Sequence, residues 1–379
     1  MTPNQIVSIH TDVSQLDDAV FDAWGAGQGE PKIDLLFWND YGLSRRHPDR
    51  ELGVVPEFPT PEGKNPNVRR SWLDRRTVRM SELIQATLER RPRAVLLNDL
   101  DLKTKLRLSF ALRRAGVSVG FRSDKNQLSL GARRGARQAF ERLVYALSFD
   151  FFCPASRLAA KYYRWPKSRP QVLFPYATDV EKFSSESADR LRPAIRQRLG
   201  LSPSSKMLLC VAKFVDREGV ADVIKAYLSL PADVEDVDLV VVGAGPKEAE
   251  FRALAASAGS RVKFVGYVPY AQLQDYFFAA DVFVHLAHRE PWGVSVSDAL
   301  SAGLGVVASD AVGAAVELMD GDLARFVTPV GNVEAAATAL RDALALPDIA
   351  SSFEPAREMV LATYSNVATA RRLASLGAQ

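Results

Sequence analysis

The chain has 379 residues, of which 47% are apolar and 25% are charged, a composition typical of globular proteins and long enough for two domains with cores of their own. No apolar run reaches the length of a membrane span and no signal-peptide pattern opens the sequence, so we expect a cytoplasmic protein rather than a membrane-spanning or secreted one. The two cysteines, Cys153 and Cys210, lie in apolar strand-like runs, which favours buried thiols over a disulfide or a metal site.

The formal net charge of +3 conceals an uneven distribution along the chain. Residues 1–179 hold 29 Lys and Arg against 20 Asp and Glu (29 − 20 = +9), and the remaining residues hold 19 against 25 (19 − 25 = −6). A basic first half is typical of proteins with anionic partners, such as a lipid-linked phosphate, a polyanionic glycan or the inner face of a membrane, but solvated arginine faces explain it equally well. Nucleic acid is not expected, because the basic residues are scattered and no aromatic-interleaved motif accompanies them.

The first half of the chain alternates short apolar runs with helical patterns. Strands are expected at 6–9, 33–38, 94–97, 117–121, 149–153 and 171–174, and helices from about residues 15 and 102 and over 70–90 and 132–147. Apolar strands separated by helices predict a doubly wound, mostly parallel sheet.

The segment 41–67 interrupts this alternation and is rich in Pro, Gly and charged residues. It is too long for an ordinary connection between a strand and a helix. We therefore expect a functional or mobile loop near an acceptor site.

Polar side chains follow several expected strands of the first half, where open α/β sheets place their ligands. They are His10, Asn98, Asp99, Arg122 and Asp124. These residues are the candidates for acceptor binding, and helix caps and turns are the alternative explanation for them. A lone histidine such as His10 is more often a structural hydrogen-bonding residue than a base.

The second half repeats the alternation after a charged stretch at 184–201, which is suited to a crossing between domains. Strands are expected at 207–212, 239–242, 262–268, 282–286 and 304–308, and helices at 332–346 and within 352–376. The last helices are expected to cross back onto the first domain.

The stretch 279–310 combines a strand, a loop, a short helix and a second strand. Its loop carries Glu290 and a Pro-Trp-Gly turn, and its helix carries Asp298 about one turn in, before Gly303 ends the helix. The helix start offers N–H groups for a phosphate, and the two acids suit hydroxyl groups. Acidic residues near helix starts are commonly capping or solvated, so the spacing of the two acids alone decides little.

The spacing Glu-x7-Asp with an internal Pro-Trp-Gly, followed by Ala-x-x-Ala-Gly and Val-Val-Ala-Ser-Asp, resembles the donor-site signature of retaining GT-B glycosyltransferases of family 4. The resemblance implies an α/β GT-B fold, in which two Rossmann-like doubly wound domains face a central cleft. It implies that Glu290 contacts the donor hexose and that Asp298, where the family has Glu, holds the ribose hydroxyls. It places the backbone of Trp292, Gly293 and Val294 near the sugar and the phosphate.

A second motif, Lys-Phe-Val-Asp-Arg-Glu-Gly, is similar to the family's Gly-Arg-x4-Lys-Gly, whose two cations bind the donor diphosphate. By this resemblance Lys213 and Arg217 bind the diphosphate, although Glu218 stands at the place of the family's Lys. Gly243, in a Gly-x-Gly-Pro turn, and Val268 match segments beside which the family seats the nucleotide. The first half resembles the family mainly in architecture.

The predicted domains are an acceptor-binding domain at 1–183, a nucleotide-sugar-binding domain at 184–351 and helices at 352–379. Asp99-Leu100-Asp101 also matches the Asp-x-Asp motif of the other, metal-dependent glycosyltransferase fold. It leads into a helix, where Asp is a normal cap, so we expect neither a metal nor a cofactor.

The sequence thus predicts a glycosyltransferase that moves a hexose from a UDP-, GDP- or ADP-sugar, with UDP favoured, to a glycan or lipid-linked acceptor with retention, in bacterial glycan, polysaccharide or glycolipid assembly. If the chain follows its family, Lys213 and the helix start near Gly293 stabilise the departing diphosphate. An oxygen of that diphosphate then takes the proton of the acceptor hydroxyl. The alternatives are a catalytically silent sugar-nucleotide-binding module and an epimerase or phosphorylase of the same fold.

Overall fold

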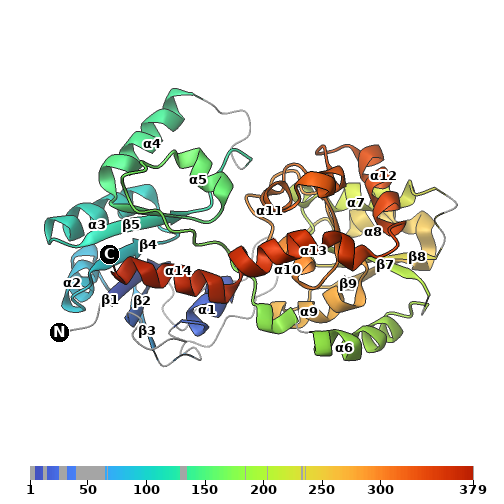
Figure 1. The fold of residues 1–379 in the computed structure, drawn as a ribbon, viewed down its shortest axis with the longest axis horizontal. Coiled ribbons are helices and arrows are strands. Elements are labelled where there is room, and N and C mark those ends of the chain that lie inside the picture. The colour runs from blue at the N-terminus through green and yellow to red at the C-terminus, as the bar shows by residue number, and fades with distance from the viewer. Residues whose placement is uncertain are drawn as a thin grey trace. The chain divides into compact units, whose positions relative to one another are not determined.

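The computed structural model describes most of the chain, whose course is drawn in Figure 1. The described residues are 5–11, 15–24, 32–39, 65, 67–128, 135–183, 185–202, 204–231, 234 and 236–378. They form two compact units: the first runs to Ala177 and is completed by residues from Tyr364 onward, and the second spans Thr178–Thr363. Over the described residues, no helix has the length and apolar character needed to cross a bilayer. The loop predicted at 41–67 lies almost wholly outside them.

The first unit is built on a sheet with the strand order β3-β2-β1-β4-β5-β6, and every pairing among these strands is parallel. The strands are β1 (Gln5–His10), β2 (Lys32–Asn39), β3 (Val68–Asp74), β4 (Ala94–Leu97), β5 (Ser118–Ser123) and β6 (Phe151–Pro154). Side chains of the central strands are buried on both faces, as a parallel sheet flanked by helices requires. This burial explains why β2 and β4 read as nearly continuous apolar runs.

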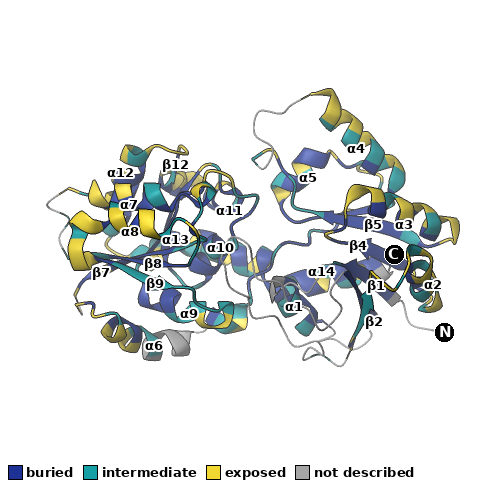
Figure 2. Cartoon of the chain, turned by 180° about the vertical axis from the view of Figure 1, so that it is seen from behind, coloured by how far each residue is buried: buried dark blue, intermediate teal, exposed yellow. Residues whose placement is uncertain are grey.

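Helices cover this sheet with apolar clusters beneath them, and their exposed sides face solvent in Figure 2. They are α1 (Gln15–Asp22), α2 (Met80–Glu89), α3 (Leu102–Arg114), α4 (Ala136–Ser148), α5 (Arg157–Tyr163) and α14 (Asn366–Ala378). Leu373 and Leu376 of α14 share one core cluster with Phe21 and Trp24, so the last helix packs beside the beginning of the chain (Figure 1).

The helix predicted over 70–90 is wrong in its first part, because β3 occupies Val68–Asp74 and α2 begins at Met80. β3 is an edge strand whose arginines obscure its pattern. The Arg70 guanidinium is buried in ion pairs with Asp18 and Asp22, while Trp72 stacks on Phe37 with 4.3 Å between ring centroids. Tertiary pairing therefore buries charged side chains that sequence periodicity assigns to a solvent-facing helix.

The strand predicted at 171–174 is reduced to an isolated bridge between Phe152 and Gln171. The segment still runs beside β6, since Val172 N–H donates to Phe152 O at 3.0 Å and Phe174 N–H donates to Pro154 O at 2.9 Å. The segment is thus extended and hydrogen-bonded without becoming a further strand of the sheet.

The second unit repeats the architecture with the order β12-β11-β10-β7-β8-β9, again parallel at every pairing among these strands. The strands are β7 (Lys206–Val211), β8 (Val237–Val242), β9 (Val262–Gly266), β10 (Val282–His285), β11 (Gly305–Ser309) and β12 (Val327–Thr328). Its α-helices are α6 (Ser185–Arg198), α7 (Val220–Leu228), α8 (Glu248–Leu254), α9 (Tyr270–Ala279), α10 (Val294–Ser301), α11 (Gly313–Leu318), α12 (Val333–Leu344) and α13 (Ile349–Met359).

Both cysteines are free and buried in sheet strands, which confirms the prediction from sequence. Burial in apolar surroundings raises the pKa of Cys153 and of Cys210 to about 12. The thiols are therefore packing groups and not nucleophiles.

Candidate functional site

A cavity of about 430 Å³ lies at the carboxyl end of the second sheet. Its walls come from the ends of β7, β8 and β10, the loop after β9 and the start of α10. The lining residues are Val211, Ala212, Lys213, Arg217, Glu218, Val242, Gly243, Tyr267, Val268, Leu273, His285, Glu290, Gly293, Val294 and Ser295. The carboxyl ends of parallel strands meet at one edge of a sheet, and open α/β sheets bind their ligands there.

The cavity brings together most of the residues predicted to bind the donor. These are Lys213, Arg217, Gly243, Val268, Glu290, Gly293 and Val294. Trp292 and Asp298 are buried in the adjoining turn and helix and do not occur among the described lining residues. The role of each residue in binding stays a prediction.

Backbone hydrogen bonds to the segment after β11 hold Glu290 in place. Its N–H donates to Ala311 O and its carbonyl accepts from Gly313 N–H, both at 3.0 Å, and its carboxylate accepts the N–H of Trp292 at 3.3 Å. Gly293 has φ +93°, and a Cβ there would lie 2.8 Å from Val312. Glycine therefore allows the sharp turn that points Glu290 and the start of α10 at the same cavity.

The segment after β7 forms a 3₁₀ turn, Asp216–Glu218, that packs directly against the end of β10. Gly219 has φ +69°, and a Cβ there would lie 1.9 Å from the carbonyl oxygen of Leu286. The N–H of His288 donates to Arg217 O at 2.8 Å. The turn carries Arg217 and Glu218, whose side chains form an ion pair of 3.0 Å at the cavity wall.

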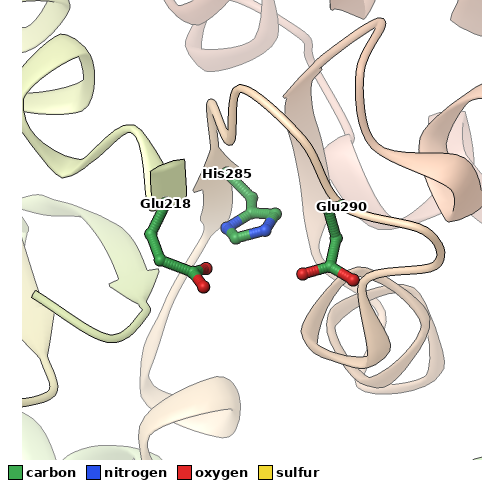
Figure 3. Close-up of side chains that lie close together, drawn as sticks. All are labelled: Glu218, His285 and Glu290. Carbon is green, nitrogen blue, oxygen red and sulfur yellow. The ribbon is translucent and has the colours of Figure 1, made fainter. Parts of the chain in front are cut away.

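His285, the last residue of β10, is a cavity residue that the sequence reasoning missed. Its side chain lies between the carboxylates of Glu218 and Glu290 in Figure 3, and only 2% of its surface is exposed. Burial lowers the pKa of His285 to about 4, so the imidazole is neutral. A polar residue at the end of an otherwise apolar strand was the signal available in the sequence.

Asp298 is buried in α10 and bonded to two hydroxyl groups of its own unit. Thr178 Oγ1 donates to its carboxylate at 3.1 Å and Tyr270 OH at 3.3 Å. Burial raises the pKa of Asp298 to about 7, opposed by these hydrogen bonds and by Lys182 and reinforced by Asp179. The carboxyl predicted to hold a ribose thus has protein hydroxyls as its partners.

In the first unit, His10 and Asn98 lie together at the ends of β1 and β4. His10 Nε2 and Ser8 Oγ share a hydrogen bond of 2.9 Å, and Asn98 Nδ2 donates to the same oxygen at 2.8 Å. Both predicted residues are buried, and burial lowers the pKa of His10. This network of buried side chains accounts structurally for His10, while a role in acceptor binding stays a prediction.

Arg122 is also buried and uses its guanidinium within the unit. It donates to both carboxylate oxygens of Asp17 at 2.7 Å and to the carbonyls of Phe174 at 3.0 Å and Pro175 at 2.9 Å. These bonds join β5 to α1 and to the segment after β6, so Arg122 has a structural function. Asp124 is half-buried and accepts a hydrogen bond from Tyr176 OH at 3.2 Å.

Asp101 is the N-cap of α3, as the alternative interpretation of the Asp-x-Asp motif predicted. Its carboxylate accepts the backbone N–H of Thr104 at 3.0 Å and the Thr104 hydroxyl at 2.6 Å. Asp99 is exposed, with φ +36°. Satisfied capping bonds explain Asp101 without a metal ion.

Comparison with known families supports this view of the second unit. Residues 192–359 match the model of the family described as glycosyl transferases group 1, and the matched segment contains every residue that lines the cavity. This part of the chain is a group 1 glycosyltransferase domain. The recognition made from the Glu-x7-Asp unit is thereby confirmed at the level of the family.

Relatives of the group 1 domain include two curated bacterial enzymes. The GDP-mannose-dependent monoacylated alpha-(1-6)-phosphatidylinositol monomannoside mannosyltransferase of Corynebacterium glutamicum is 30% identical over 147 residues, 39% of this chain and 37% of that protein. The lipopolysaccharide glucosyltransferase WaaG of Escherichia coli is 29% identical over 184 residues, 48% of this chain and 49% of that protein. The chain thus spans less than half the length of each of these relatives.

Solved structures extend the likeness to both units. Anabaena HepE in complex with UDP has a TM-score of 0.70 and 15% identity, and the match covers 99% of this chain and 100% of that one. At such identity the likeness concerns the fold alone. With the two parallel six-stranded sheets, it shows that the chain has the two-domain α/β fold of the GT-B type.

The raised pKa of Asp298 generates a prediction about stability. Between about pH 4 and pH 7 the folded protein holds a proton on Asp298 that the unfolded chain has lost, so the contribution of this group to stability falls as pH rises through that range. Asp298→Asn removes this titration. Because about two pH units of this range lie between pH 5 and the folded pKa, we expect the variant to gain about 2–3 kcal/mol of stability relative to the wild type between pH 5 and pH 8.

Thermal and urea unfolding of both proteins at the two pH values measure this difference. Asp320→Asn, which changes an exposed carboxylate of the same unit, is the matched control for the loss of one negative charge. A stability difference for Asp298→Asn that is the same at both pH values would show that burial does not perturb this carboxyl.

Proposed function

We propose that the protein is a glycosyltransferase that moves a hexose from a nucleoside diphosphate sugar to an acceptor hydroxyl with retention of the anomeric configuration. The observation that carries the proposal is the convergence of Lys213, Arg217, Glu290 and the start of α10 on one cavity of a group 1 glycosyltransferase domain. Cations and helix N–H groups suit a diphosphate, and a carboxylate suits sugar hydroxyls.

The proposed reaction depends on charge compensation at the leaving group. Lys213 and the N–H groups at the start of α10 stabilise the negative charge that grows on the diphosphate as the bond to the sugar breaks. An oxygen of the leaving diphosphate accepts the proton of the incoming hydroxyl on the same face of the sugar, so no nucleophile from the protein is required. Glu290 holds the hexose so that this face is presented to the acceptor.

We propose a UDP-, GDP- or ADP-sugar as the donor, with a UDP-sugar favoured. The base would lie beside Tyr267 and Val268, which line the cavity. The Corynebacterium relative is named GDP-mannose-dependent and HepE is described with UDP, so the two comparisons favour different bases. A panel of donors is therefore needed to choose among them.

The proposed acceptor is a glycan or a lipid-linked molecule at a membrane surface. Support comes from exposed apolar side chains on α3 and α4. They are Phe110, Phe140, Leu143 and Leu147, with exposed fractions of 54–70%. Arg107, Arg114 and Arg137 are exposed on the same two helices. Apolar side chains that enter a bilayer, flanked by cations that attract anionic lipids, are typical of helices that lie on a membrane.

The alternative is a catalytically silent sugar-nucleotide-binding module. Glu218 favours this alternative, because a carboxylate stands where the family has a Lys for the diphosphate. Epimerase chemistry has no separate support in the cavity. Hydrolysis or transfer measured with a bound donor distinguishes the enzyme from the silent module.

The donor proposal is tested by ligand-induced stabilisation with a panel of UDP-, GDP- and ADP-sugars. A ligand at 100 times its Kd should stabilise the second unit by about 2.7 kcal/mol. Lys213→Ala should weaken binding of that donor by about 1.5–3 kcal/mol, because a charge-assisted bond to phosphate is lost, and Arg217→Ala should weaken it less. Lys225→Ala on α7 is the control, since Lys225 is exposed and outside the cavity. Binding that is unchanged in Lys213→Ala would contradict the assignment.

Glu290→Gln tests transition-state binding of the sugar. We expect turnover to fall by about 100-fold or more while the Kd for free nucleoside diphosphate stays nearly unchanged, because the carboxylate contacts the hexose and not the nucleotide. Steady-state kinetics and calorimetry measure the two effects. Glu334→Gln, at the exposed start of α12, should match the wild type in both. Normal turnover in folded Glu290→Gln would remove Glu290 from the mechanism.

Vesicle sedimentation tests the membrane proposal. The protein should bind phosphatidylcholine vesicles more tightly when they contain phosphatidylglycerol, and added salt should weaken the binding. Leu143→Ser with Leu147→Ser should reduce the partition coefficient by about 10-fold or more, since each leucine contributes roughly 1 kcal/mol on insertion. Leu228→Ser, an exposed leucine of the other unit, should have no effect. Equal binding by all variants would contradict this surface.

A further inference from the structure

His285 is a buried polar side chain whose hydrogen bonding is unsatisfied among the described residues. Neither Nδ1 nor Nε2 has a hydrogen-bond partner there, although the ring is almost fully buried at the cavity wall. Burying an imidazole without partners costs free energy, and such groups are rare in folded proteins. The position therefore requires an explanation beyond packing.

The second sheet holds this imidazole in place. His285 ends β10 and pairs with Ala308 of β11, and its ring lies nearly parallel to that of Phe283, with 6.2 Å between the centroids and 24° between the planes. A side chain packed in this way on a central strand has little freedom to turn toward another group of the protein. The imidazole is thus presented to the cavity by a rigid element and not by a loop.

Two carboxylates from different elements face the ring. Figure 3 shows the imidazole between Glu218 and Glu290, and a ring nitrogen and one carboxylate oxygen of each glutamate all lie within 4.8 Å of one another. A hydroxyl that accepts a bond from an imidazole N–H and donates one to a carboxylate holds those two atoms about 4.6 Å apart at a tetrahedral oxygen. One hydroxyl therefore joins His285 to Glu290 with no more than adjustment of side chains.

The chemistry of these groups selects a hydroxyl over a phosphate. Because the buried imidazole is neutral, one of its nitrogens donates and the other accepts, and a hydroxyl can do both in return. The carboxylates of Glu218 and Glu290 accept hydrogen bonds only, and they repel a phosphate oxygen, which carries negative charge and has no hydrogen to donate. This part of the cavity thus suits the hexose and not the diphosphate.

We propose that His285 is a specificity-determining residue that recognises one hydroxyl of the donor hexose together with Glu290. The imidazole N–H donates to the hydroxyl oxygen, and the hydroxyl donates to the Glu290 carboxylate. The substrate class is then a nucleoside diphosphate hexose with a free hydroxyl at this position. The inference rests on the proposed function, because it assigns a further contact to the same donor.

A sugar that lacks this hydroxyl is rejected because of the groups it leaves buried. Both the imidazole and the carboxylate then lose their partner in the sugar, and a buried polar group without a partner costs more than an average hydrogen bond contributes. Sites built around a hydroxyl discriminate against the deoxy compound by larger factors than an apolar pocket discriminates between sizes.

His285→Leu separates recognition of the sugar from packing. The full chain is titrated by calorimetry with UDP-glucose and GDP-mannose, and with UDP and GDP. For the sugar nucleotide that the wild type binds more tightly, the Kd should rise by about 10-fold or more, whereas the Kd for the matching nucleoside diphosphate should change by less than about 2-fold.

The melting temperature of His285→Leu should equal or exceed that of the wild type. Leucine suits a buried apolar strand, and the substitution removes no hydrogen bond of the fold among the described residues. A lower melting temperature together with an equal loss of affinity for both ligands would show a structural role and overturn the proposal.

His288→Leu is the matched control, because His288 is an exposed histidine on the loop after β10, 2.7 Å from Asp222, and is not among the described lining residues of the cavity. It should match the wild type with all four ligands. His285→Gln is the conservative variant: its amide keeps a donor and an acceptor, so its affinity for the sugar nucleotide should lie between those of the wild type and His285→Leu. It carries the test if His285→Leu does not fold, and wild-type affinity in His285→Gln would then contradict the proposal.

Sugar nucleotides that each lack one hydroxyl identify the contact. The wild type should bind one of these deoxy analogues about 10-fold or more weakly than the parent, and His285→Leu should lose most of that difference because the partner of the hydroxyl is gone. Independent effects of the substitution and of every deoxy analogue would mean that His285 does not contact the sugar.

The same titrations separate this inference from the proposed function. If no sugar nucleotide binds the wild type, the proposed function fails and this inference fails with it. If the sugar nucleotide binds the wild type and His285→Leu equally, the donor assignment stands and the role of His285 alone is wrong.

Discussion

The cavity of the second unit depends on the close approach between the turn after β7 and the end of β10. A side chain at Gly219 would overlap the carbonyl of Leu286, and the bond from His288 N–H to Arg217 O holds the two segments together. This contact sets Glu218 beside His285. Because β7 and β10 are neighbours in the sheet, their carboxyl ends deliver both segments to the same edge, and the loop to α10 then closes the cavity with Glu290.

Charge is the second constraint on this cavity. Lys213 and Arg217 face two carboxylates, and Arg217 is already paired with Glu218. A diphosphate that enters such a site gains less binding free energy than it would from two unopposed cations, because the ion pair between Arg217 and Glu218 must be shared or broken. The N–H groups of α10 add a contribution that does not depend on side-chain ionisation, since the dipoles of the helix are fixed.

The sequence predicted the fold well wherever strands are buried on both faces. β1, β4, β7, β8 and β10 are short apolar runs between helices, and these runs are recognisable without tertiary information. β3 escaped prediction because it is an edge strand whose Arg70 is neutralised by Asp18 and Asp22 of α1. Those pairings depend on which segments the sheet brings together, so local periodicity carries no sign of them.

The same contrast applies to the site. Motif spacing singled out Lys213 and Glu290 because each follows a strand within a recognisable unit, and both line the cavity. His285 and Glu218 were treated as strand and turn residues, although each breaks a local rule: an imidazole in an apolar strand and a buried carboxylate in a turn at the cavity wall. Local rules are usually broken where a ligand compensates the cost. The two departures lie 67 residues apart in sequence and meet in one cavity, a meeting that local sequence patterns cannot predict because it depends on the order of the strands.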